Sequence, residues 1–374
     1  MKISVHHSCD EAESYRAARV KSLFNVESGA TFDLDAELPI EDLAWRLGVI
    51  VGPSGAGKSS LGQRLWGQDS VYTPDWPDAP IIDAVAPGAA FDDVTAALAA
   101  VGLGSVPTWL RPYRVLSNGE RFRADLARLV AGDVTRVVVD EFSSVVDRQI
   151  ARVGAMAFGK AWRRRPVGQA LLLSCHYDII DWLQPDWVLD LKDGRFHARW
   201  RRRRPAIELE IRETDWRWWP HFEPHHYLKL PKMIAARCYV AFVNDEPVAH
   251  VAFSTRPGML EARACRLVVM PEWQGAGVGM RFLNAVCGRW RAGKNRFGLR
   301  MPTLFHTSHP GLAAALRRDR SWTQVSAVLH GDNRERSKAS IARSAVNFKS
   351  NAPGAGFGGH FRAVQGFRYI GEAT

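Results

Sequence analysis

The sequence has few cysteines and no long apolar run, and both deficits exclude whole classes of protein. Its five cysteines lie at positions 9, 175, 238, 265 and 287 without any C-x-x-C spacing, so neither a zinc site nor a disulfide framework is expected. No segment approaches the ~18 apolar residues that cross a bilayer. The N-terminal stretch MKISVHHSCDEAES lacks the apolar core of a signal peptide. These absences predict a soluble, cytoplasmic protein with no membrane partner.

Acidic residues are scarce in the second half of the chain. Residues 1–198 contain 21 Lys and Arg against 26 Asp and Glu, a net charge of −5, whereas residues 199–374 contain 29 against 13, a net charge of +16. The change begins at the run RWRRRR over 199–204. Because a basic surface attracts polyanions, this half predicts a nucleic-acid partner. The alternative is a basic linker that lies on the acidic first domain.

Hydrophobic patterning predicts an α/β first domain. Residues 15–50 alternate apolar and polar positions and end in the run WRLGVIVG, which predicts strands leading into a buried one. The short runs TRVVVDEF and QALLLSCH predict buried parallel strands. FDDVTAALAAVGL and GERFRADLARLVAG predict helices, and the Pro- and Asp-rich residues 74–88 predict a loop. Strands and helices interleaved in this way are typical of α/β proteins.

The second part of the chain has a different pattern of elements. RCYVAFVNDEPVAHVAFST predicts a hairpin, CRLVVM a strand, and GMRFLNAVCGRWRA and GLAAALRR two helices. Residues 331–359 are polar and then glycine-rich, which predicts a mobile segment. FRAVQGFRYIG predicts a returning strand. The result is a mixed α+β domain.

A phosphate-binding motif follows the first buried strand. Residues 52–59 read GPSGAGKS and fit G-x-x-x-x-G-K-[ST] between a strand and a helix. In this motif the glycines let backbone N–H groups surround phosphates, Lys58 neutralises the β/γ oxygens, and the Ser59 hydroxyl binds Mg²⁺. The predicted ATP-binding residues are Gly52, Ser54, Gly55, Gly57, Lys58, Ser59 and Ser60.

Three further segments narrow the class of ATPase. LSNGE (116–120) precedes a helix, VVVDE (137–141) ends a strand in two carboxylates, and LSCH (173–176) ends the next strand in a histidine. In order and spacing, residues 15–198 resemble the ABC-type ATPases. The resemblance implies that Asp140 holds Mg²⁺, Glu141 polarises the attacking water and His176 contacts the γ-phosphate. It also implies a head-to-tail homodimer, in which Ser117 and Gly119 meet the γ-phosphate of the opposite protomer.

The sequence departs from that family at several places. Asn118 and Glu120 replace the Gly and Gln of the signature, and YTPDWPDAPIID offers no Q-loop glutamine. The aromatic residue that stacks on adenine in the family corresponds to Phe24, for which a plain core role is the alternative. Coupling between the nucleotide and the partner domain is therefore expected to be unusual.

A second glycine-rich loop follows a strand in the basic half. Gln274, Gly277 and Gly279 match the Q/R-x-x-G-x-G/A pattern, so the segment resembles the GNAT acyltransferases. The loop does not fit G-x-G-x-x-G, which makes a dinucleotide site improbable. The resemblance implies acetyl-CoA or another acyl-CoA as cofactor, bound through its pyrophosphate by backbone N–H groups. The predicted residues are Val268, Val269, Met270, Gln274, Gly275, Ala276, Gly277, Val278 and Gly279.

The sequence does not fix the general base of acyl transfer. Two clusters carry candidates, HHY at 225–227 and HTSHP at 306–310, because histidine suits proton transfer near neutral pH. For each histidine a structural role is the alternative. Trp216, Trp218 and Trp219 either stack on bases or belong to the core. The candidate catalytic residues are His225, His226, Tyr227, Ser308 and His309.

Together these observations predict an ABC-type P-loop ATPase domain over 1–198, a basic linker over 199–206 and a GNAT-like domain over 207–374. The fusion resembles ATPase–acetyltransferase proteins of prokaryotes and phages, and HHYL and TSHP resemble the GNAT-related Mom enzymes that modify DNA adenine. The first hypothesis is therefore an enzyme that modifies nucleic acid, DNA favoured over RNA. The alternatives are a nucleotide-gated N-acetyltransferase for a protein or small amine, and an ATP-switched nucleic-acid-binding protein with an inactive GNAT fold.

Overall fold

The computed structural model describes residues 1–11, 13–24, 31–198, 207–227, 232–233, 235–255, 261–329 and 363–372. The basic run 199–204, the linker around it and the 331–359 segment predicted from the sequence lie outside these ranges. The side chain of Phe24, the candidate for adenine stacking, is not described either.

The chain forms two compact units, and each unit is built from two separate segments of the sequence. The first contains Met1–Asp75 and Gly132–Pro205, and the second contains Trp76–Ala131 and Ala206–Thr374. Residues 76–131, called the insertion below, lie within the ATPase-like sequence but pack with the C-terminal part of the chain. The domain boundaries drawn at 198 and 207 remain a prediction.

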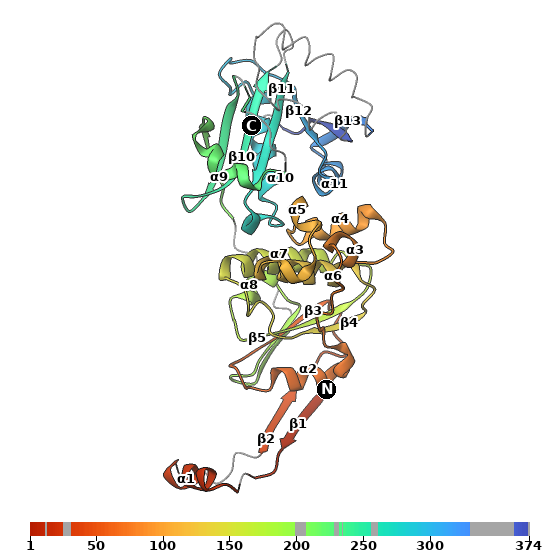
Figure 1. Ribbon diagram of the computed structural model, residues 1–374, viewed down its shortest axis with the longest axis vertical. Helices are drawn as coiled ribbons and strands as arrows, with labels where there is room; N and C mark the ends of the chain where they lie inside the picture. The colour runs from red at the N-terminus through yellow and green to blue at the C-terminus, as the bar shows by residue number, and fades with distance from the viewer. Residues whose placement is uncertain are drawn as a thin grey trace. The chain divides into compact units, whose positions relative to one another are not determined.

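A five-stranded sheet organises the first unit (Figure 1), in the order β4-β5-β3-β6-β7. The strands are β3 (Leu47–Val51), β4 (Arg136–Val139), β5 (Gln169–Ser174), β6 (Trp187–Asp190) and β7 (Arg195–Ala198). The first four are parallel and only β7 is antiparallel to its neighbour. β3 and β5 are buried along nearly their whole length, as their apolar runs predict.

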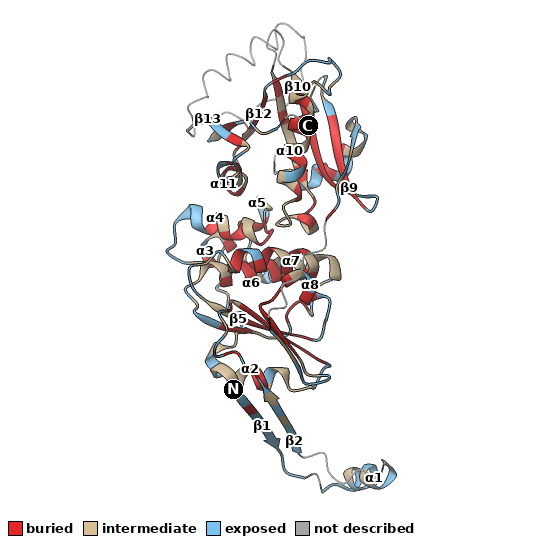
Figure 2. Ribbon diagram, turned by 180° about the vertical axis from the view of Figure 1, so that it is seen from behind, coloured by how far each residue is buried: buried red, intermediate tan, exposed pale blue. Residues whose placement is uncertain are grey.

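Helices and the sheet of the first unit enclose its core. The helical elements are α2 (Lys58–Trp66), η1 (Gln68–Ser70), α7 (Arg148–Trp162) and α8 (Ile179–Leu183). Figure 2 shows buried residues concentrated along α7 and β5. Leu61 of α2 is buried with Ile50, Val138 and Leu173 of the sheet, so α2 shares one core with β3, β4 and β5.

A small antiparallel sheet of β1 (Lys2–Ser8) and β2 (Thr31–Glu37) completes this unit. The helix α1 (Tyr15–Phe24) lies between these two strands in the sequence. The prediction of strands from residue 15 onward is wrong for α1. Its sequence YRAARVKSLF consists mainly of Ala, Arg, Lys and Leu, which have high helix propensity. The strand prediction holds for β2, where exposed and half-buried residues alternate.

The insertion is helical. Its elements are α3 (Ile81–Ala84), α4 (Phe91–Ala100), α5 (Val106–Trp109), η2 (Tyr113–Val115) and α6 (Asn118–Ala131). The two predicted helices are confirmed as α4 and α6. The prediction of loop throughout 74–88 is wrong at α3, a single turn that forms because Ile81 and Ala84 are buried. Asp125 of α6 accepts hydrogen bonds from Trp76 Nε1 and Tyr113 OH, both at 2.8 Å.

The rest of the second unit is built on a seven-stranded sheet in the order β13-β14-β12-β11-β10-β9-β8. The strands are β8 (Glu210–Thr214), β9 (Arg237–Val243), β10 (Glu246–Thr255), β11 (Ala262–Val269), β12 (Thr303–Thr307), β13 (Trp322–Val328) and β14 (Val364–Tyr369). The helical elements are η3 (Trp216–Trp218), α9 (Trp219–Phe222), η4 (Glu223–His225), η5 (Pro271–Trp273), α10 (Val278–Arg291) and α11 (Pro310–Arg318).

The pairings in this sheet confirm the predicted mixed domain. β9 and β10 form the expected hairpin, with Asn244 and Asp245 at φ of 48° and 63°, as a tight hairpin turn requires. β14 is the predicted returning strand and lies antiparallel between β12 and β13. β11 and β12 are parallel. Phe253 of β10 stacks on Trp290 of α10, with ring centroids 5.3 Å apart.

Candidate functional site

The first glycine-rich loop lies at the carboxyl end of β3, where the central strand of the first sheet leads into α2. Gly55 and Gly57 have φ of 78° and 84°, conformations that glycine adopts without strain. Gly57 is the N-cap of α2, and a Cβ there would lie 2.7 Å from Leu34 Cδ2. The loop and the helix end thus form the arrangement of backbone N–H groups that binds phosphate.

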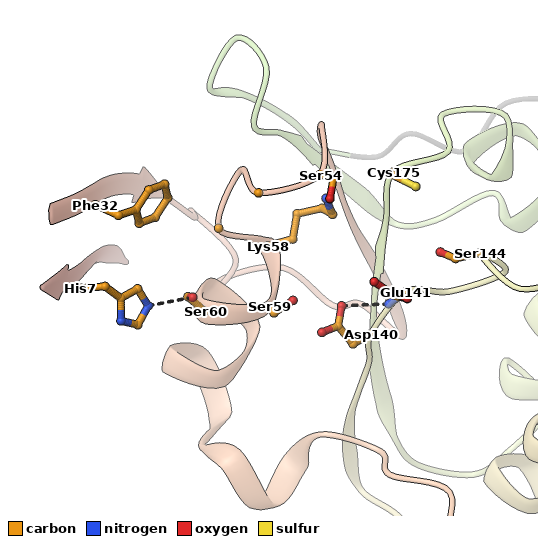
Figure 3. A pocket seen from close by; sticks show the side chains of 12 residues that line it. His7, Phe32, Ser54, Lys58, Ser59, Ser60, Asp140, Glu141, Ser144 and Cys175 are labelled. Carbon is orange, nitrogen blue, oxygen red and sulfur yellow. Dashed lines mark hydrogen bonds between the residues drawn. The ribbon is translucent and has the colours of Figure 1, made fainter. Parts of the chain in front are cut away.

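A cavity of ≈ 340 Å³ opens beside this loop (Figure 3). It is lined by the loop, the first turn of α2, the small sheet and the ends of β4 and β5. Most residues predicted to bind ATP and its metal lie here. They are Ser54, Gly55, Gly57, Lys58, Ser59, Ser60, Asp140 and Glu141.

Charged and hydroxyl groups meet in this cavity. Lys58 Nζ donates to the carbonyl oxygens of Gly52 and Pro53 at 2.9 and 2.7 Å, so its charge lies over the loop. Figure 3 shows the Ser59 hydroxyl and the Asp140 carboxylate pointing towards one another. Both are hard oxygen ligands of the kind that Mg²⁺ takes. No group of three or more His, Cys, Asp or Glu in the described ranges forms a metal site by itself, so a cation here would also need oxygen ligands from phosphate and water.

The residues that line the cavity differ in part from those that the sequence predicts. The predicted His176 is not among the lining residues, and its backbone N–H donates to Ser174 Oγ at 3.1 Å. His7 and Phe32 line the cavity instead, with ring centroids 6.3 Å apart and His7 Nε2 2.8 Å from Ser60 Oγ. The alternation in β2 could have shown that Phe32 shares a face with Leu34 and Ala36. It could not show which cavity that face borders.

The signature segment begins α6 with a capping arrangement. The N–H and the hydroxyl of Ser117 both donate to Glu120 Oε2 at 2.9 Å, and Thr108 Oγ1 donates to Oε1 at 2.8 Å. Burial opposes ionisation of Glu120, but the hydrogen bonds from Ser117 and Thr108 outweigh it and lower the pKa of Glu120. The acid that replaces the family Gln therefore fixes the first turn of α6. Neither Ser117 nor Gly119 lines the cavity of the first unit.

The second glycine-rich loop follows β11 and leads through η5 into α10. Gly275 and Gly277 have φ of 91° and 81°, and Gly277 is the N-cap of α10. Gly279 packs so closely on the sheet that a Cβ would lie 2.9 Å from Val269 Cγ2, whereas a Cβ at Gly277 would meet nothing within 4 Å. The predicted residues Gln274, Gly275, Ala276, Gly277, Val278 and Gly279 thus form a second helix-start loop, without a cationic side chain of its own.

Beside this loop the sheet is incompletely paired. β11 and β12 pair only from Ala262↔Thr303 to Ala264↔Phe305, although β11 continues to Val269 and β12 to Thr307. The register between β10 and β11 also shifts opposite Arg266, whose φ is 54°, as in a β-bulge. The carboxyl half of β11 therefore has an edge that β12 does not occupy.

The polar groups on that edge can be assigned from the ladder. Met270 N–H donates to Val248 O at 3.0 Å, and Val269 is the Cα partner of Ala249. Because successive residues of a strand direct their polar groups to opposite neighbours, the N–H and C=O of Val269 point towards β12. Gln274 Nε2 donates to Val269 O at 3.0 Å. Of the predicted residues Val268, Val269 and Met270, it is therefore Val269 that faces the unpaired edge.

Candidate acid and base groups come together near the start of α11. The rings of His226 and Tyr227 are 5.1 Å apart, and those of Tyr227 and His309 are 6.3 Å apart. His225 is exposed, and Ser308 is half-buried directly before His309. The structure thus brings His226, Tyr227 and His309 into one cluster, while the catalytic roles of all five candidates stay predictions.

Both ring nitrogens of His309 are in use. Nε2 donates to Gly104 O at 3.0 Å, and Nδ1 accepts from Leu312 N–H at 3.2 Å as the N-cap of α11. Burial lowers the pKa of His309, so the ring is neutral at physiological pH. A role in proton transfer would require one of these hydrogen bonds to break.

A buried histidine that the sequence analysis did not single out lies nearby. His250 of β10 is fully buried among the rings of Trp216, Trp219 and Phe222, and its Nδ1 donates to Arg266 O at 3.1 Å. Burial lowers the pKa of His250 to about 4. The only signal in the sequence was a histidine in a strand of small apolar residues. Trp219 is itself buried, which favours a core role over stacking on bases.

Comparison with known proteins assigns both parts of the chain. Residues 208–315 match the model of the Acetyltransferase (GNAT) family. The cytochrome c biogenesis ATP-binding export protein CcmA of Rhodospirillum rubrum is 31% identical, over 35% of this chain and 68% of that protein.

Solved structures of ABC cassettes are similar at low identity. A dimeric bacterial ABC transporter cassette has 12% identity and a TM-score of 0.34, over 45% of this chain and 89% of that one. A dimeric ATP-binding cassette in a post-hydrolysis state bound to ADP and Pi has 12% identity and a TM-score of 0.38, over 53% and 98%.

None of the helices in the described ranges combines the length and apolar character needed to cross a membrane.

The family assignment rests on the CcmA relative for the ATPase part and on the GNAT match for the C-terminal part. The chain therefore belongs to the ABC-type ATPases and carries a GNAT acyltransferase domain, so that one polypeptide is both an ATPase and an acyltransferase.

Proposed function

We propose that this protein transfers an acyl group from acyl-CoA to a base of nucleic acid, with DNA favoured over RNA, under the control of ATP. The observation that carries the acyl-CoA part is the glycine loop Gln274–Gly279 beside the unpaired edge of β11. A helix start with free N–H groups and no cationic side chain suits a pyrophosphate. An unpaired strand edge offers backbone hydrogen bonds to an extended, amide-containing chain.

The chemistry proposed for this site is direct transfer. An acceptor nitrogen attacks the thioester carbonyl carbon and gives its proton to the base, the C–S bond breaks, and the leaving thiolate takes a proton from the acid. The N–H of Val269 would polarise the carbonyl, and holding both reactants in one site supplies much of the rate. His226 and Tyr227, whose rings are 5.1 Å apart, are the proposed base and acid.

The ATPase part of the proposal uses the cavity of the first unit. Lys58 would neutralise the β/γ-phosphates, Ser59 and Asp140 would hold Mg²⁺, and Glu141 would polarise the attacking water. Ser117 and Gly119 lie in the other unit and do not line this cavity. We propose that they complete the ATP site of a second copy in a head-to-tail homodimer.

Charge supports the proposed acceptor. Residues 199–374 carry a net charge of +16 against −5 for residues 1–198, and a surface of that sign binds phosphates by releasing their counterions. An acceptor amine on a base inside a duplex must first be exposed. Consumption of ATP by the first unit is the proposed source of that rearrangement.

Nucleoside masses test the proposal directly. The intact protein is expressed in a host, DNA and RNA are digested separately, and nucleosides are weighed. The matched variants are Gly277→Val in the loop and Gly298→Val outside it, because both glycines have positive φ and open space where a Cβ would lie. We expect a new nucleoside with the wild type and Gly298→Val but not with Gly277→Val. If no new nucleoside forms while acetyl-CoA is still consumed, the acceptor is a protein or small amine.

A further inference from the structure

The insertion contacts the glycine loop Gln274–Gly279, called the acyl-CoA loop below, through the side chain of Gln274. Gly104 N–H donates to Gln274 Oε1 at 3.0 Å, and Gln274 Nε2 donates to Val269 O at 3.0 Å. The two ends of one carboxamide therefore join a loop of the ATPase sequence to the unpaired edge of β11. No other residue of the predicted acyl-CoA loop offers a side chain of this kind.

Arg123 makes a second connection between the same parts. Its side chain is buried, and Nη1 donates to Gly102 O at 2.6 Å and also to Pro271 O, the first residue of η5. Arg123 belongs to α6, the helix that begins at the signature segment Ser117–Glu120. A guanidinium that holds two backbone carbonyls fixes their relative position more firmly than a single hydrogen bond.

Two glycines let the insertion approach this closely. Gly102 has φ of 84°, and a Cβ there would lie 2.1 Å from the backbone oxygen of Gln274. A Cβ at Gly104 would lie 2.7 Å from Gln274 Oε1. Since the first of these atoms belongs to the backbone, no side-chain movement could make room for alanine at position 102. Nearby, Gly104 O accepts from His309 Nε2, which ties the same loop to α11.

We propose that the insertion positions the acyl-CoA loop and makes acyl-CoA affinity depend on the nucleotide bound to the ATPase. Arg123 and Gly104 hold Pro271 and Gln274, so that the N–H groups of residues 275–279 stay convergent on one anion. α6 carries Arg123 and begins within the signature segment, so a nucleotide that moves the start of α6 also moves the contacts that hold the loop. The inference rests on the proposed binding of acyl-CoA and on the proposed homodimer, in which the signature residues meet the nucleotide of the second copy, and it specifies the regulation of acyl-CoA binding.

The proposal couples the binding of a nucleotide at one site to the binding of acyl-CoA at another. If the nucleotide changes acyl-CoA affinity, acyl-CoA must change nucleotide affinity by the same factor. Coupling of this kind is typically about 5- to 150-fold. A contact that only stabilised the fold would alter the unfolding temperature of a variant but would not alter this factor.

The test measures acetyl-CoA binding to the full-length protein by calorimetry, with and without ATP, in a Glu141→Gln background that slows hydrolysis. Two variants break the contact from either side: Gly102→Ala in the insertion and Gln274→Met in the loop. The matched control is Gly88→Ala, because Gly88 lies in the insertion, has φ of 82° and would place a Cβ with nothing within 4 Å of it. ATP binding and thermal unfolding of each variant report whether it is folded.

We expect ATP to change acetyl-CoA affinity at least ~5-fold in the wild type and in Gly88→Ala. Gly102→Ala and Gln274→Met should bind acetyl-CoA about 10-fold more weakly and show no effect of ATP. Variants that bind like the wild type, or that bind weakly but keep the effect of ATP, overturn the inference alone. Absence of acetyl-CoA binding by every form overturns the proposed function as well.

Discussion

Two loops of this protein have nearly the same backbone at their helix starts but different surroundings. Gly57 (φ 84°, ψ 13°) is the N-cap of α2, and Gly277 (φ 81°, ψ 8°) is the N-cap of α10. β3, before the first loop, is paired with a parallel strand on each side, whereas β11 loses its parallel partner after three residues. The shared backbone suits phosphate in both proposed sites, and the pairing of the sheet beside each loop differs.

The residue after the N-cap glycine also separates the two loops. Lys58 follows Gly57 and places its charge over the loop, and Asp140 and Glu141, which follow β4, line the same cavity. Buried Val278 follows Gly277. A triphosphate with a metal needs the first set of groups, while a pyrophosphate on a long organic chain needs only the N–H groups and an open strand edge. Four changes would break or sharpen this contrast.

The largest effect is expected for Glu141→Gln. If Glu141 activates the attacking water as proposed, losing its carboxylate should slow ATP hydrolysis by ~10²–10⁴-fold, while ATP binding persists because Lys58 and the loop are unchanged. Phosphate release and nucleotide binding measure the two quantities separately. Hydrolysis at the wild-type rate would show that another residue activates the water.

Lys58→Ala removes the charge that distinguishes the first loop. ATP turnover should fall by ~10²–10³-fold, the cost of one electrostatic group at a phosphoryl-transfer site. Acetyl-CoA binding should fall much less, because Lys58 belongs to the first loop and the second loop has no lysine of its own. Lys192→Ala, at an exposed lysine outside the cavity, is the control and should leave turnover unchanged.

Acid should weaken the second unit through His250. The pKa of His250 lies at about 4 against ~6.5 in an unfolded chain, so between these values the unfolded chain binds a proton that the folded one does not. Stability is therefore lost as the pH falls through this window, by about 2 kcal/mol between pH 7 and 5. After burial, the hydrogen bond to Arg266 O favours the charged form of His250, while the charges of His226 and Arg266 oppose it. Burial also lowers the pKa of His309, a shift of the same sign.

Urea unfolding at pH 7 and pH 5 measures this loss. His250→Asn should reduce the difference between the two pH values, whereas His221→Asn, at an exposed histidine of α9, should keep it. An equal pH dependence in all three proteins would show that His250 does not carry the effect.

The smallest effect is expected for Gly279→Ala. Its Cβ would lie 2.9 Å from Val269 Cγ2, so the side chain of Val269 must shift, at a cost of about 1 kcal/mol. Acetyl-CoA affinity should fall by roughly 5-fold, with ATP binding unchanged. Calorimetry with both ligands gives the two numbers, and a fall in ATP affinity of the same size would contradict the separation of the two loops.

Local sequence patterns predict those parts of the fold and of the candidate sites that depend on residues close together in the sequence. The strand, glycine loop and helix around Lys58 are specified within some twenty residues, and so are those around Gly277. The hairpin at Asn244 and Asp245 and the returning strand β14 were likewise readable from alternation and turn residues. The glycines, having no Cβ, mark both proposed phosphate-binding loops in the sequence itself.

What the sequence did not reveal depends on contacts between distant segments. Phe32 borders the cavity of the first unit because β2 pairs with β1, and His250 has a lowered pKa because α9 helps to bury it. Gly102 offered no pattern that pointed to Gln274, 172 positions later, since only packing of the insertion brings them together. In α1, helix propensity outweighed an apparent alternation that had suggested a strand.

The course of the chain has a consequence for how this protein can be divided. It passes from one compact unit to the other between 75 and 76, between 131 and 132, and between 205 and 206. A gene cut at the basic linker would leave the acyltransferase half without α4, which packs against α11 where Gly311 leaves room for Ala99. Separately produced halves would each lack a partner that belongs to the other, so the enzyme is interleaved rather than modular.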